Sequence, residues 1–246
     1  MPKFFIESNQ INNNTIKIKG EDVNHIANVL RKQIGDELNI CNSTTSDNFL
    51  CKIIEINKES IICDIIERIE NKSDNSPNIT IFQGLPKADK MELIIQKCTE
   101  LGVNEFVPLQ MERCVVKLDS KNEAKKIERW QKIVETAAKQ CGRNNIPKVE
   151  NLINIKKLCN LLDKYDIVLV AYEQEKENTL KIKLKDIKDK KNINIAVVIG
   201  PEGGIEASEI EELKDSGAEI ITLGERILRT ETVGIAMASI IMYELE

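Results

Sequence analysis

The sequence has few of the residues from which metal sites, secretory signals and membrane spans are built. It contains one histidine, His25, and its seven cysteines are scattered without a Cys-x-x-Cys pair, so we expect no metal site. The amino terminus has no basic segment followed by an apolar one, and no apolar run is long enough to cross a bilayer. These absences predict reduced thiols, no membrane partner and a cytoplasmic location.

An excess of basic charge is also lacking. The 246 residues include 35 Lys and Arg against 40 Asp and Glu, a formal net charge of −5. This balance argues against a protein that coats nucleic acid non-specifically, although a local basic groove would be enough to bind RNA. A hydrophobic content of 41% with 30% charged residues is typical of a globular protein.

The first part of the chain reads as a small β-barrel. Short apolar segments separated by turn residues predict strands at 4–6, 15–18, 37–40, 49–54 and 60–66. One short helix is predicted at about 22–31. Residues 71–77 are polar and rich in turn formers, which predicts a linker and a first domain over residues 1–72.

Beyond the linker, strands alternate with helices. Strands are predicted at 78–83, 103–109, 167–171, 195–199 and 219–223. Helices are predicted at 87–101, 122–141, 155–162, 208–215 and from about 232. This alternation is typical of an α/β domain with a parallel sheet, which we place at residues 73–246.

A glycine-rich turn follows the apolar strand that ends at Ile199. The sequence Gly200-Pro201-Glu202-Gly203-Gly204 precedes a helix, and glycines in such a turn let a ligand approach the backbone closely. The pattern is neither Gly-x-Gly-x-x-Gly nor a phosphate-binding P-loop, so a neutral or cationic ligand fits better than a phosphate. The alternative is a tight strand–helix connection without a ligand.

A second segment runs from Leu223-Gly224 through Ile227-Leu228 to Arg229-Thr230-Glu231-Thr232. Thr230 or Thr232 can cap the following helix, and Glu231 suits the positive end of its dipole, so capping explains them as well as catalysis does. Arg229 has no comparable structural need. The competing interpretation is that it pairs with Glu202 or Glu231 to hold the loop.

These two segments resemble the cofactor loops of the SPOUT methyltransferases, and among them the 16S ribosomal RNA (uracil-N3)-methyltransferases. The resemblance extends to residues 25–31, 87–92, 96–103, 112–117, 130–133 and 140–144, and so covers nearly the whole chain. Two positions depart from the usual pattern of the family: Lys3, where arginine is common, and Ala88, where glycine is usual.

The resemblance implies a fold that periodicity alone would not predict. It implies an N-terminal PUA-like β-barrel that binds RNA and a C-terminal SPOUT α/β domain whose end forms a trefoil knot. It also implies a homodimer with the active site at the subunit interface.

The implied reaction transfers the methyl group of S-adenosyl-L-methionine to N3 of a uridine in the decoding region of 16S rRNA, within the assembled 30S subunit. Arg229 is the first catalytic candidate, because a cationic donor would stabilise charge developing on the uracil oxygens. Glu202 and Glu231 are candidates for a general base, although capping explains them almost as well.

The resemblance also implies the remaining site residues. The expected cofactor-binding residues are Ala171, Tyr172, Ile199, Gly200, Glu202, Gly203, Gly204, Leu223, Gly224, Ile227, Leu228, Arg229 and Thr230. The candidate RNA contacts are Lys3, His25, Arg31, Lys87, Arg113 and Arg143, with packing favoured over RNA contact for His25. Two alternatives remain: a non-catalytic RNA-binding or ribosome-assembly protein, and a SPOUT methyltransferase that acts on tRNA.

Overall fold

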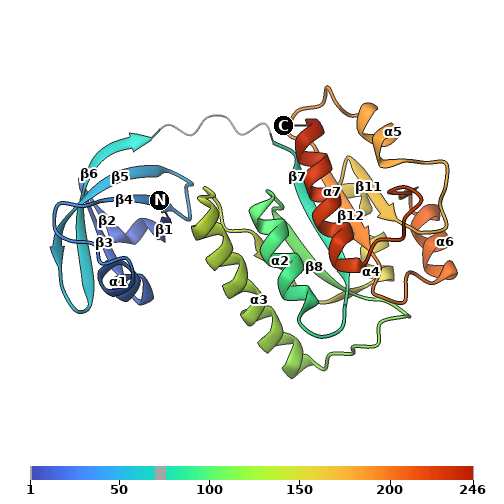
Figure 1. The fold of residues 1–246 in the computed structure, drawn as a ribbon, viewed down its shortest axis with the longest axis horizontal. Coiled ribbons are helices and arrows are strands. Elements are labelled where there is room, and N and C mark those ends of the chain that lie inside the picture. Colours follow the sequence, from blue (N-terminus) through green and yellow to red (C-terminus); the bar gives the residue numbers. More distant parts are fainter. Residues whose placement is uncertain (1, 70–75, 246) are drawn as a thin grey trace. The chain divides into compact units, whose positions relative to one another are not determined.

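The computed structural model describes residues 2–69 and 76–245, which fall into two compact units (Figure 1). Unit 1 contains the described residues of Met1–Asp74 together with Ala138–Ile146, and unit 2 contains those of Asn75–Ala137 and Pro147–Glu246. Most of the linker predicted at 71–77 lies outside the described residues, as does the boundary predicted between residues 72 and 73. That boundary therefore stays a prediction.

Unit 1 is a curled six-stranded sheet with the strand order β1-β4-β5-β6-β3-β2 (Figure 1). Its strands are β1 (Lys3–Ile6), β2 (Ile11–Asn12), β3 (Thr15–Lys19), β4 (Glu37–Asn42), β5 (Asn48–Ile56) and β6 (Ser60–Ile69). β1 pairs with β4 in parallel, and the other pairs are antiparallel. Alternation along β3 buries Ile16 and Ile18, so one face of the sheet forms the core of the unit.

The helix predicted at 22–31 is shorter and is divided. A single α-helical turn, α1 (Glu21–Asn24), continues as a π-helix (His25–Val29). Arg31 then adopts a left-handed φ of 53°, which is incompatible with continuing the helix. A short 3₁₀ helix (Ser8–Gln10) also precedes β2.

Unit 2 is built on a parallel sheet, as the alternation of strands and helices predicts. The order is β10-β8-β7-β12-β11-β13, with β9 pairing beside β8. The bounds are β7 (Asn78–Gly84), β8 (Glu105–Gln110), β9 (Lys148–Val149), β10 (Ile153–Asn154), β11 (Ile167–Ala171), β12 (Asn194–Ile199) and β13 (Glu219–Ile221). The central strands β7 and β12 are buried along almost their whole length because helices cover both faces.

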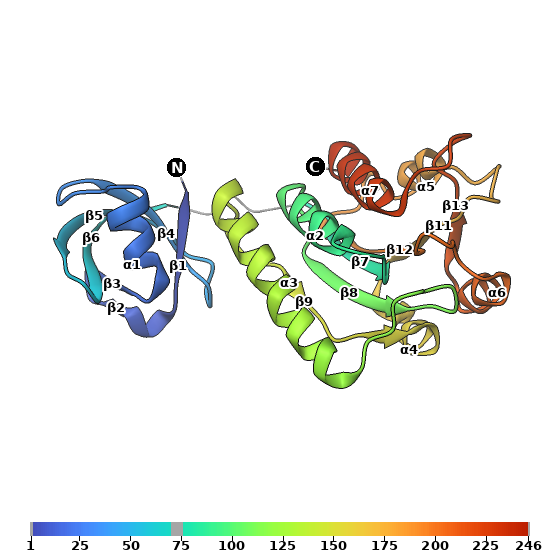
Figure 2. The same cartoon turned by 60° about the horizontal axis from the view of Figure 1, so that its bottom comes forward.

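The helices of unit 2 are α2 (Lys90–Glu100), α3 (Ser120–Cys141), α4 (Ile155–Cys159), α5 (Leu180–Lys185), α6 (Ala207–Asp215) and α7 (Thr230–Leu245), and the end of α3, from Ala138, belongs to unit 1. A 3₁₀ turn (Leu162–Lys164) follows α4. α2 and α7 pack side by side on one face of the sheet, and α4 packs with α6 on the other (Figure 2). The sequence patterns miss α5, β9 and β10, which are too short to show a period.

The start of α2 departs from the predicted helix at 87–101. Ala88 has a φ of 52°, a left-handed conformation that an α-helix does not contain, so the helix begins at Lys90. This is the position at which glycine is usual in the resembled family, and glycine adopts such a conformation without strain.

Three further findings concern features that the sequence argues against. No helix among the described residues has the length and apolar character needed to span a membrane. Within residues 2–69 and 76–245, no group of three His, Cys, Asp or Glu side chains is placed to hold a metal ion. All seven cysteines are free thiols, and five of them are buried.

Candidate active site

Two loops leave the carboxyl edge of the parallel sheet of unit 2 and enclose adjoining cavities. Since β11, β12 and β13 run in the same direction, their carboxyl ends lie at one edge of the sheet. The loop after β12 and the segment before α7 line a cavity of about 390 Å³, and a second cavity of about 90 Å³ lies beside it. The two cavities share Ala171, Glu173, Ile227, Leu228 and Val233.

Every residue expected to bind the cofactor lines one of these cavities. Those that line only the larger one are Ile199, Gly200, Glu202, Gly203, Gly204, Arg229 and Thr230. Those that line only the smaller one are Tyr172, Leu223 and Gly224, and Ala171, Ile227 and Leu228 line both. The structure therefore brings these residues together, and their contact with a cofactor stays a prediction.

The glycines of the first loop are required by close approaches of the chain. A Cβ on Gly200 would lie 2.8 Å from Cγ1 of Ile205 and 3.1 Å from the carbonyl carbon of Gly204, which has a left-handed φ of 73°. A Cβ on Gly84, at the end of β7, would lie 2.7 Å from Cδ of Pro201. A side chain at Gly200 or Gly84 would therefore displace the loop that lines the larger cavity.

Thr230 links the two loops through its side chain. Its hydroxyl donates a hydrogen bond to the carbonyl of Gly200 at 2.7 Å and accepts one at 2.9 Å from the amide nitrogen of Gln83, which is fully buried. Thr230 is the first residue of α7, and the carbonyl of Arg229 accepts from the N–H groups of Thr232 and Val233. The observed bonds of this hydroxyl thus join strand ends rather than cap the helix.

Glu202 and Glu231 meet at the ammonium group of Lys90. Nζ of Lys90 lies 2.8 Å from Oε1 of Glu202 and 3.3 Å from Oε2 of Glu231. The backbone N–H of Lys87 also donates to the Glu202 carboxylate. Burial acts to raise the pKa of Glu202, but the hydrogen bonds from Lys90 and from the backbone outweigh it and hold this pKa below its ordinary value. Glu202 is therefore a weak base in this structure.

Arg229 lines the larger cavity with its side chain exposed. Among the described residues, no side chain forms an ion pair or a hydrogen bond with its guanidinium group. The alternative in which Arg229 pairs with Glu202 or Glu231 is wrong for this structure, because Lys90 occupies both carboxylates. The five N–H donors of Arg229 remain available to a ligand.

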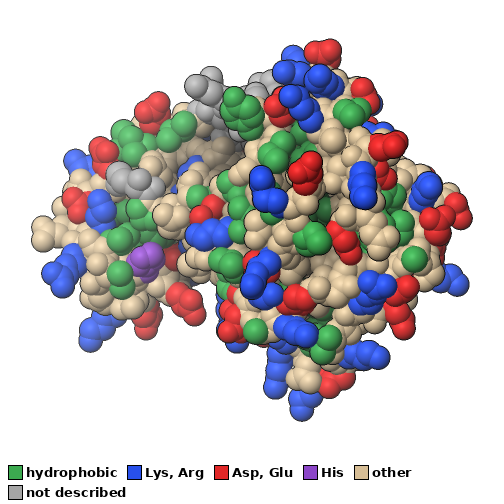
Figure 3. Space-filling view, turned by 45° about the vertical axis from the view of Figure 1, so that its right-hand side comes forward, with side chains coloured by type: hydrophobic (Ala, Val, Ile, Leu, Met, Phe, Trp, Pro, Cys, Tyr) green, Lys and Arg blue, Asp and Glu red, His purple; other side chains and the backbone are tan. Residues whose placement is uncertain are grey.

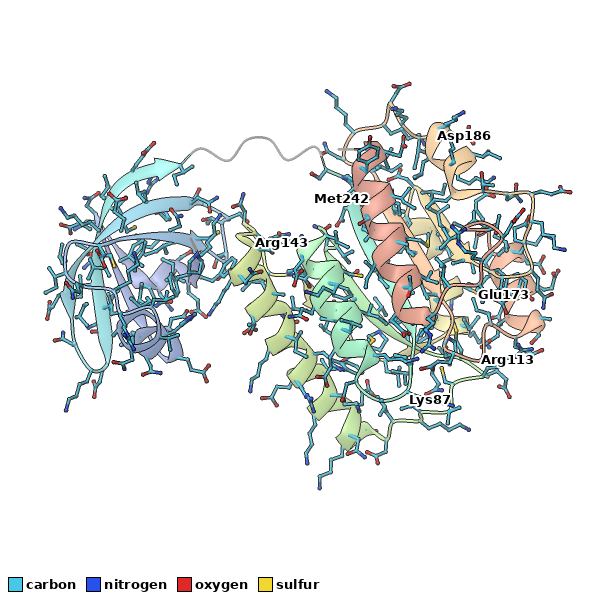
Figure 4. All side chains as sticks on the ribbon, in the orientation of Figure 1. Lys87, Arg113, Arg143, Glu173, Asp186 and Met242 are labelled. Atoms are coloured by element: carbon cyan, nitrogen blue, oxygen red, sulfur yellow. The ribbon has the colours of Figure 1, made fainter. Side chains whose placement is uncertain are left out.

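Arg113, predicted to contact RNA, holds the first glycine loop. Its Nε donates to Oε2 of Glu206 at 2.7 Å, and its Nη1 donates to the carbonyl of Gly203 at 3.1 Å. Figure 4 shows Arg113 and Glu173 on the same side of unit 2. Hydrogen bonding to Glu206 raises the pKa of Arg113, so the guanidinium stays charged. These contacts leave RNA binding by Arg113 a prediction.

The other candidate RNA contacts are divided between the two units. Lys87 is exposed beside the larger cavity, whereas Lys3, His25, Arg31 and Arg143 belong to unit 1. Lys3 donates to the side-chain oxygens of Asn48 and Asn144, and the ring of His25 packs edge-on against Phe4 at 6.0 Å, the packing favoured from the sequence. Figure 3 shows basic and acidic side chains interspersed on the visible surfaces of the two units.

Lys90, Glu173 and Gln83 are among the residues of this site that the sequence analysis did not assign. Lys90 and Glu173 line the larger cavity, and Gln83 supports it from the core. A glutamine that directly follows the apolar pair Ile81-Phe82 was the visible signal for Gln83, because buried polar side chains need a specific partner. Lys90 gave no comparable signal, since its partners lie more than 100 positions further along the chain.

Comparison with known proteins agrees with this arrangement. Residues 72–242 match the model of an RNA methyltransferase domain, and residues 18–66 match that of an RNA methyltransferase PUA domain. The chain is 38% identical over 251 residues to the ribosomal RNA small subunit methyltransferase E of Bacillus subtilis, covering 100% of this chain and 98% of that protein. The chain belongs to this family of RNA methyltransferases. The predictions of a methyltransferase and of a parallel α/β domain are confirmed, and the predicted small β-barrel is found as a curled six-stranded sheet that overlaps the match to a PUA domain.

Solved structures of similar proteins contain a cofactor. The ribosomal RNA small subunit methyltransferase E of Neisseria gonorrhoeae, bound to S-adenosylmethionine, is 28% identical, with a TM-score of 0.85 and coverage of 99% of this chain and 97% of that one. A methyltransferase of Legionella pneumophila, also in complex with S-adenosylmethionine, is 28% identical, with a TM-score of 0.84 and coverage of 98% and 96%.

Proposed function

We propose that this chain transfers the methyl group of S-adenosylmethionine to N3 of a uridine in the decoding region of 16S rRNA, acting on the assembled small subunit. The observation that carries the proposal is the position of Arg229. Arg229 lines a cavity formed by both loops, and its guanidinium group forms no ion pair within residues 2–69 and 76–245. The similarity to a ribosomal RNA small subunit methyltransferase over the whole chain supports the substrate class.

The larger cavity fits this cofactor in size and in chemistry. Its volume of about 390 Å³ lies within the range of small-molecule sites. Gly200, Gly203 and Gly204 line the cavity without side chains, so a ligand can approach their backbone closely, which suits the adenosine moiety. Lys90, Glu202 and Glu231 together carry one net negative charge, and this charge complements the cationic sulfonium.

The cofactor supplies an electrophilic methyl group, and the residues of this chain prepare the acceptor. N3 of uridine must lose its proton, which passes to solvent water, and the resulting negative charge spreads onto O2 and O4. Arg229 can donate hydrogen bonds to one of these oxygens and stabilise that charge in the transition state. Glu202 is held by Lys90 with a lowered pKa and Glu231 is paired with the same ammonium, so the structure favours charge stabilisation by Arg229 over a carboxylate base.

The RNA would be positioned by the predicted first domain, residues 1–72, and the chemistry would take place in the predicted SPOUT domain, residues 73–246.

We further propose the trefoil knot and the homodimer implied by the resemblance. α7 supports the homodimer, because it is apolar around its circumference while Ile240 and Tyr243 are 42% and 86% exposed. Ile227, which lines both cavities, is 82% exposed, and a partner subunit that covered it would lie beside the site. Because the substrate is ribosomal, the site of action would be the cytoplasm.

Mass mapping of 16S rRNA from a strain that lacks this gene tests the proposal. We expect loss of one N3-methyluridine from the decoding region and its restoration in vitro by the purified chain with S-adenosylmethionine and isolated 30S subunits. Unchanged 16S rRNA together with the loss of a methyl group from tRNA would indicate a tRNA enzyme. Absence of cofactor binding by calorimetry would indicate a non-catalytic RNA-binding protein.

A further inference from the structure

Lys90 joins three segments that are distant in the sequence. It is the first residue of α2, Glu202 lies in the loop after β12, and Glu231 lies in the first turn of α7. Its ammonium group lies 2.8 Å and 3.3 Å from oxygens of these two carboxylates. Lys90 and Glu202 both line the larger cavity, so the contact forms part of its wall.

The three side chains are only partly exposed, at 28% for Lys90, 25% for Glu202 and 16% for Glu231. Oε2 of Glu231 is itself buried, and among the described residues its partner is the ammonium group of Lys90. Without the ammonium, two carboxylates would face each other in a site where solvent screens them poorly. We expect their repulsion to move the loop around Glu202 away from Glu231 at the start of α7.

We propose that Lys90 is a positioning residue for cofactor binding: its ammonium group holds Glu202 and Glu231 together, and thereby closes the first glycine loop against the start of α7. This inference rests on the proposed function and deepens it. Lys90 acts through the two loops rather than on the reacting atoms. Hydrogen bonding to Glu202 raises the pKa of Lys90, so the ammonium remains charged at neutral pH.

A purely stabilising role makes a different prediction. The hydroxyl of Thr230 already ties α7 to the carbonyl of Gly200, and this bond does not involve Lys90. The fold therefore retains one connection between the same segments when the ammonium is removed. What the ion pairs add is the placement of the loop around Glu202, so their loss should affect cofactor affinity more than melting temperature.

The test compares Lys90→Met with Lys90→Arg and with Lys97→Met in the full-length chain. Lys97 is a matched control, because it is on the same helix and forms an ion pair with Glu100 at 2.9 Å outside the cavity. S-adenosylmethionine affinity is measured by calorimetry and stability by thermal melting without ligand. We expect Lys90→Met to weaken binding about tenfold, as for a partly buried ion pair, and Lys90→Arg to stay within about threefold of the wild type.

A further variant keeps the test decisive if Lys90→Met folds poorly. In Lys90→Met/Glu231→Gln, one of the two opposed charges is gone, so we expect folding and part of the affinity to return. Wild-type affinity in Lys90→Met, or equal losses in Lys90→Met and Lys97→Met, would overturn the inference. A wild-type chain that binds no S-adenosylmethionine would instead contradict the proposed function.

Discussion

The hydroxyl of Thr230 and the carbonyl of Gly200 form a 2.7 Å hydrogen bond across 30 positions of the sequence. The same hydroxyl accepts from the buried amide of Gln83, so one side chain connects the ends of β7 and β12 with the start of α7. The bond joins the glycine loop after β12 to the start of α7, and residues of both segments line the larger cavity.

Replacement of Thr230 by valine should therefore lower both stability and cofactor affinity. The variant keeps the shape of the side chain but leaves the Gln83 amide and the Gly200 carbonyl without this partner, at a cost of about 1–3 kcal/mol in the free energy of unfolding. Thr230→Ser should retain most of that free energy. Chemical denaturation measures the effect, and Thr232→Val, at an exposed position of the same helix, is the control. Equal stability of Thr230→Val and Thr232→Val would contradict the prediction.

Two glycine substitutions should have opposite effects. A Cβ on Gly200 would collide with the loop at 2.8 Å, whereas a Cβ on Gly234, inside α7, would meet its nearest neighbours at 3.4–3.6 Å, which is ordinary contact. We expect Gly200→Ala to lower the melting temperature and abolish tight cofactor binding. Gly234→Ala should be neutral or stabilising by up to about 1 kcal/mol, because alanine favours a helix. Melting curves and cofactor titration of both variants check this contrast.

The sequence predicts the regular parts of this fold because their signals are local. β11 is found at the predicted residues, and β7 and β12 differ from their predictions by one residue at one end. The glycine loops were also found, since Gly200 and Gly224 follow apolar strands directly. Short elements such as α5 (Leu180–Lys185) were missed, because six residues do not establish a period.

Long-range pairing of side chains could not be predicted. The sequence suggested that Arg229 pairs with Glu202 or Glu231, but it did not show that Lys90 pairs with both carboxylates and that, in the part of the chain that the structure describes, Arg229 has no ion pair. Helix boundaries also depend on single residues. α2 begins at Lys90 and not at the predicted residue 87, because Ala88 has a left-handed φ that the spacing of apolar residues does not reveal.

Ala88→Gly should stabilise the protein. The left-handed conformation of Ala88, with a φ of 52°, costs a residue with a Cβ about 1–2 kcal/mol, and glycine avoids most of this strain. A higher melting temperature is the expected result. In Ala124→Gly, at an exposed position within α3, the same change should instead destabilise the protein by about 1 kcal/mol. A fall in melting temperature for both variants would show that the conformation at Ala88 carries no strain.

The contribution of the Lys90–Glu202 pair to stability should be independent of pH near neutrality. The pKa of Glu202 is lowered, so its contribution is present above the unfolded pKa and is lost as pH falls through the folded value. The pKa of Lys90 is raised, so its contribution is present below the unfolded pKa and is lost as pH rises through the folded value. The difference in melting temperature between wild type and Lys90→Met should therefore be constant between about pH 6 and pH 9 and shrink in acid. If the difference in melting temperature disappeared within the neutral range, its pH dependence would come from a titratable group other than Lys90 or Glu202.

Replacement of Arg229 should lower the rate of methyl transfer and leave cofactor affinity and stability nearly unchanged. Its guanidinium group is exposed, lines the larger cavity and has no ion-pair partner among the described residues, so its removal breaks no observed contact of its side chain. Loss of a donor that stabilises transition-state charge typically costs about 100- to 1000-fold in rate. We therefore expect Arg229→Ala to lose methyl transfer to 30S subunits by that factor, while its melting temperature and cofactor affinity stay close to wild type.

Arg229→Lys should recover only part of the rate, because a lysine ammonium lacks the planar fork with which arginine can bind a carbonyl and a phosphate together. Single-turnover methyl transfer with saturating cofactor measures the chemical step, and Lys181→Ala, at an exposed position on α5, is the control for a general loss of positive charge. If Arg229→Ala lost cofactor affinity and melting temperature in proportion to its rate, Arg229 would hold the loop rather than stabilise the uracil. Because the structure already assigns both neighbouring carboxylates to Lys90, we expect rate alone to fall.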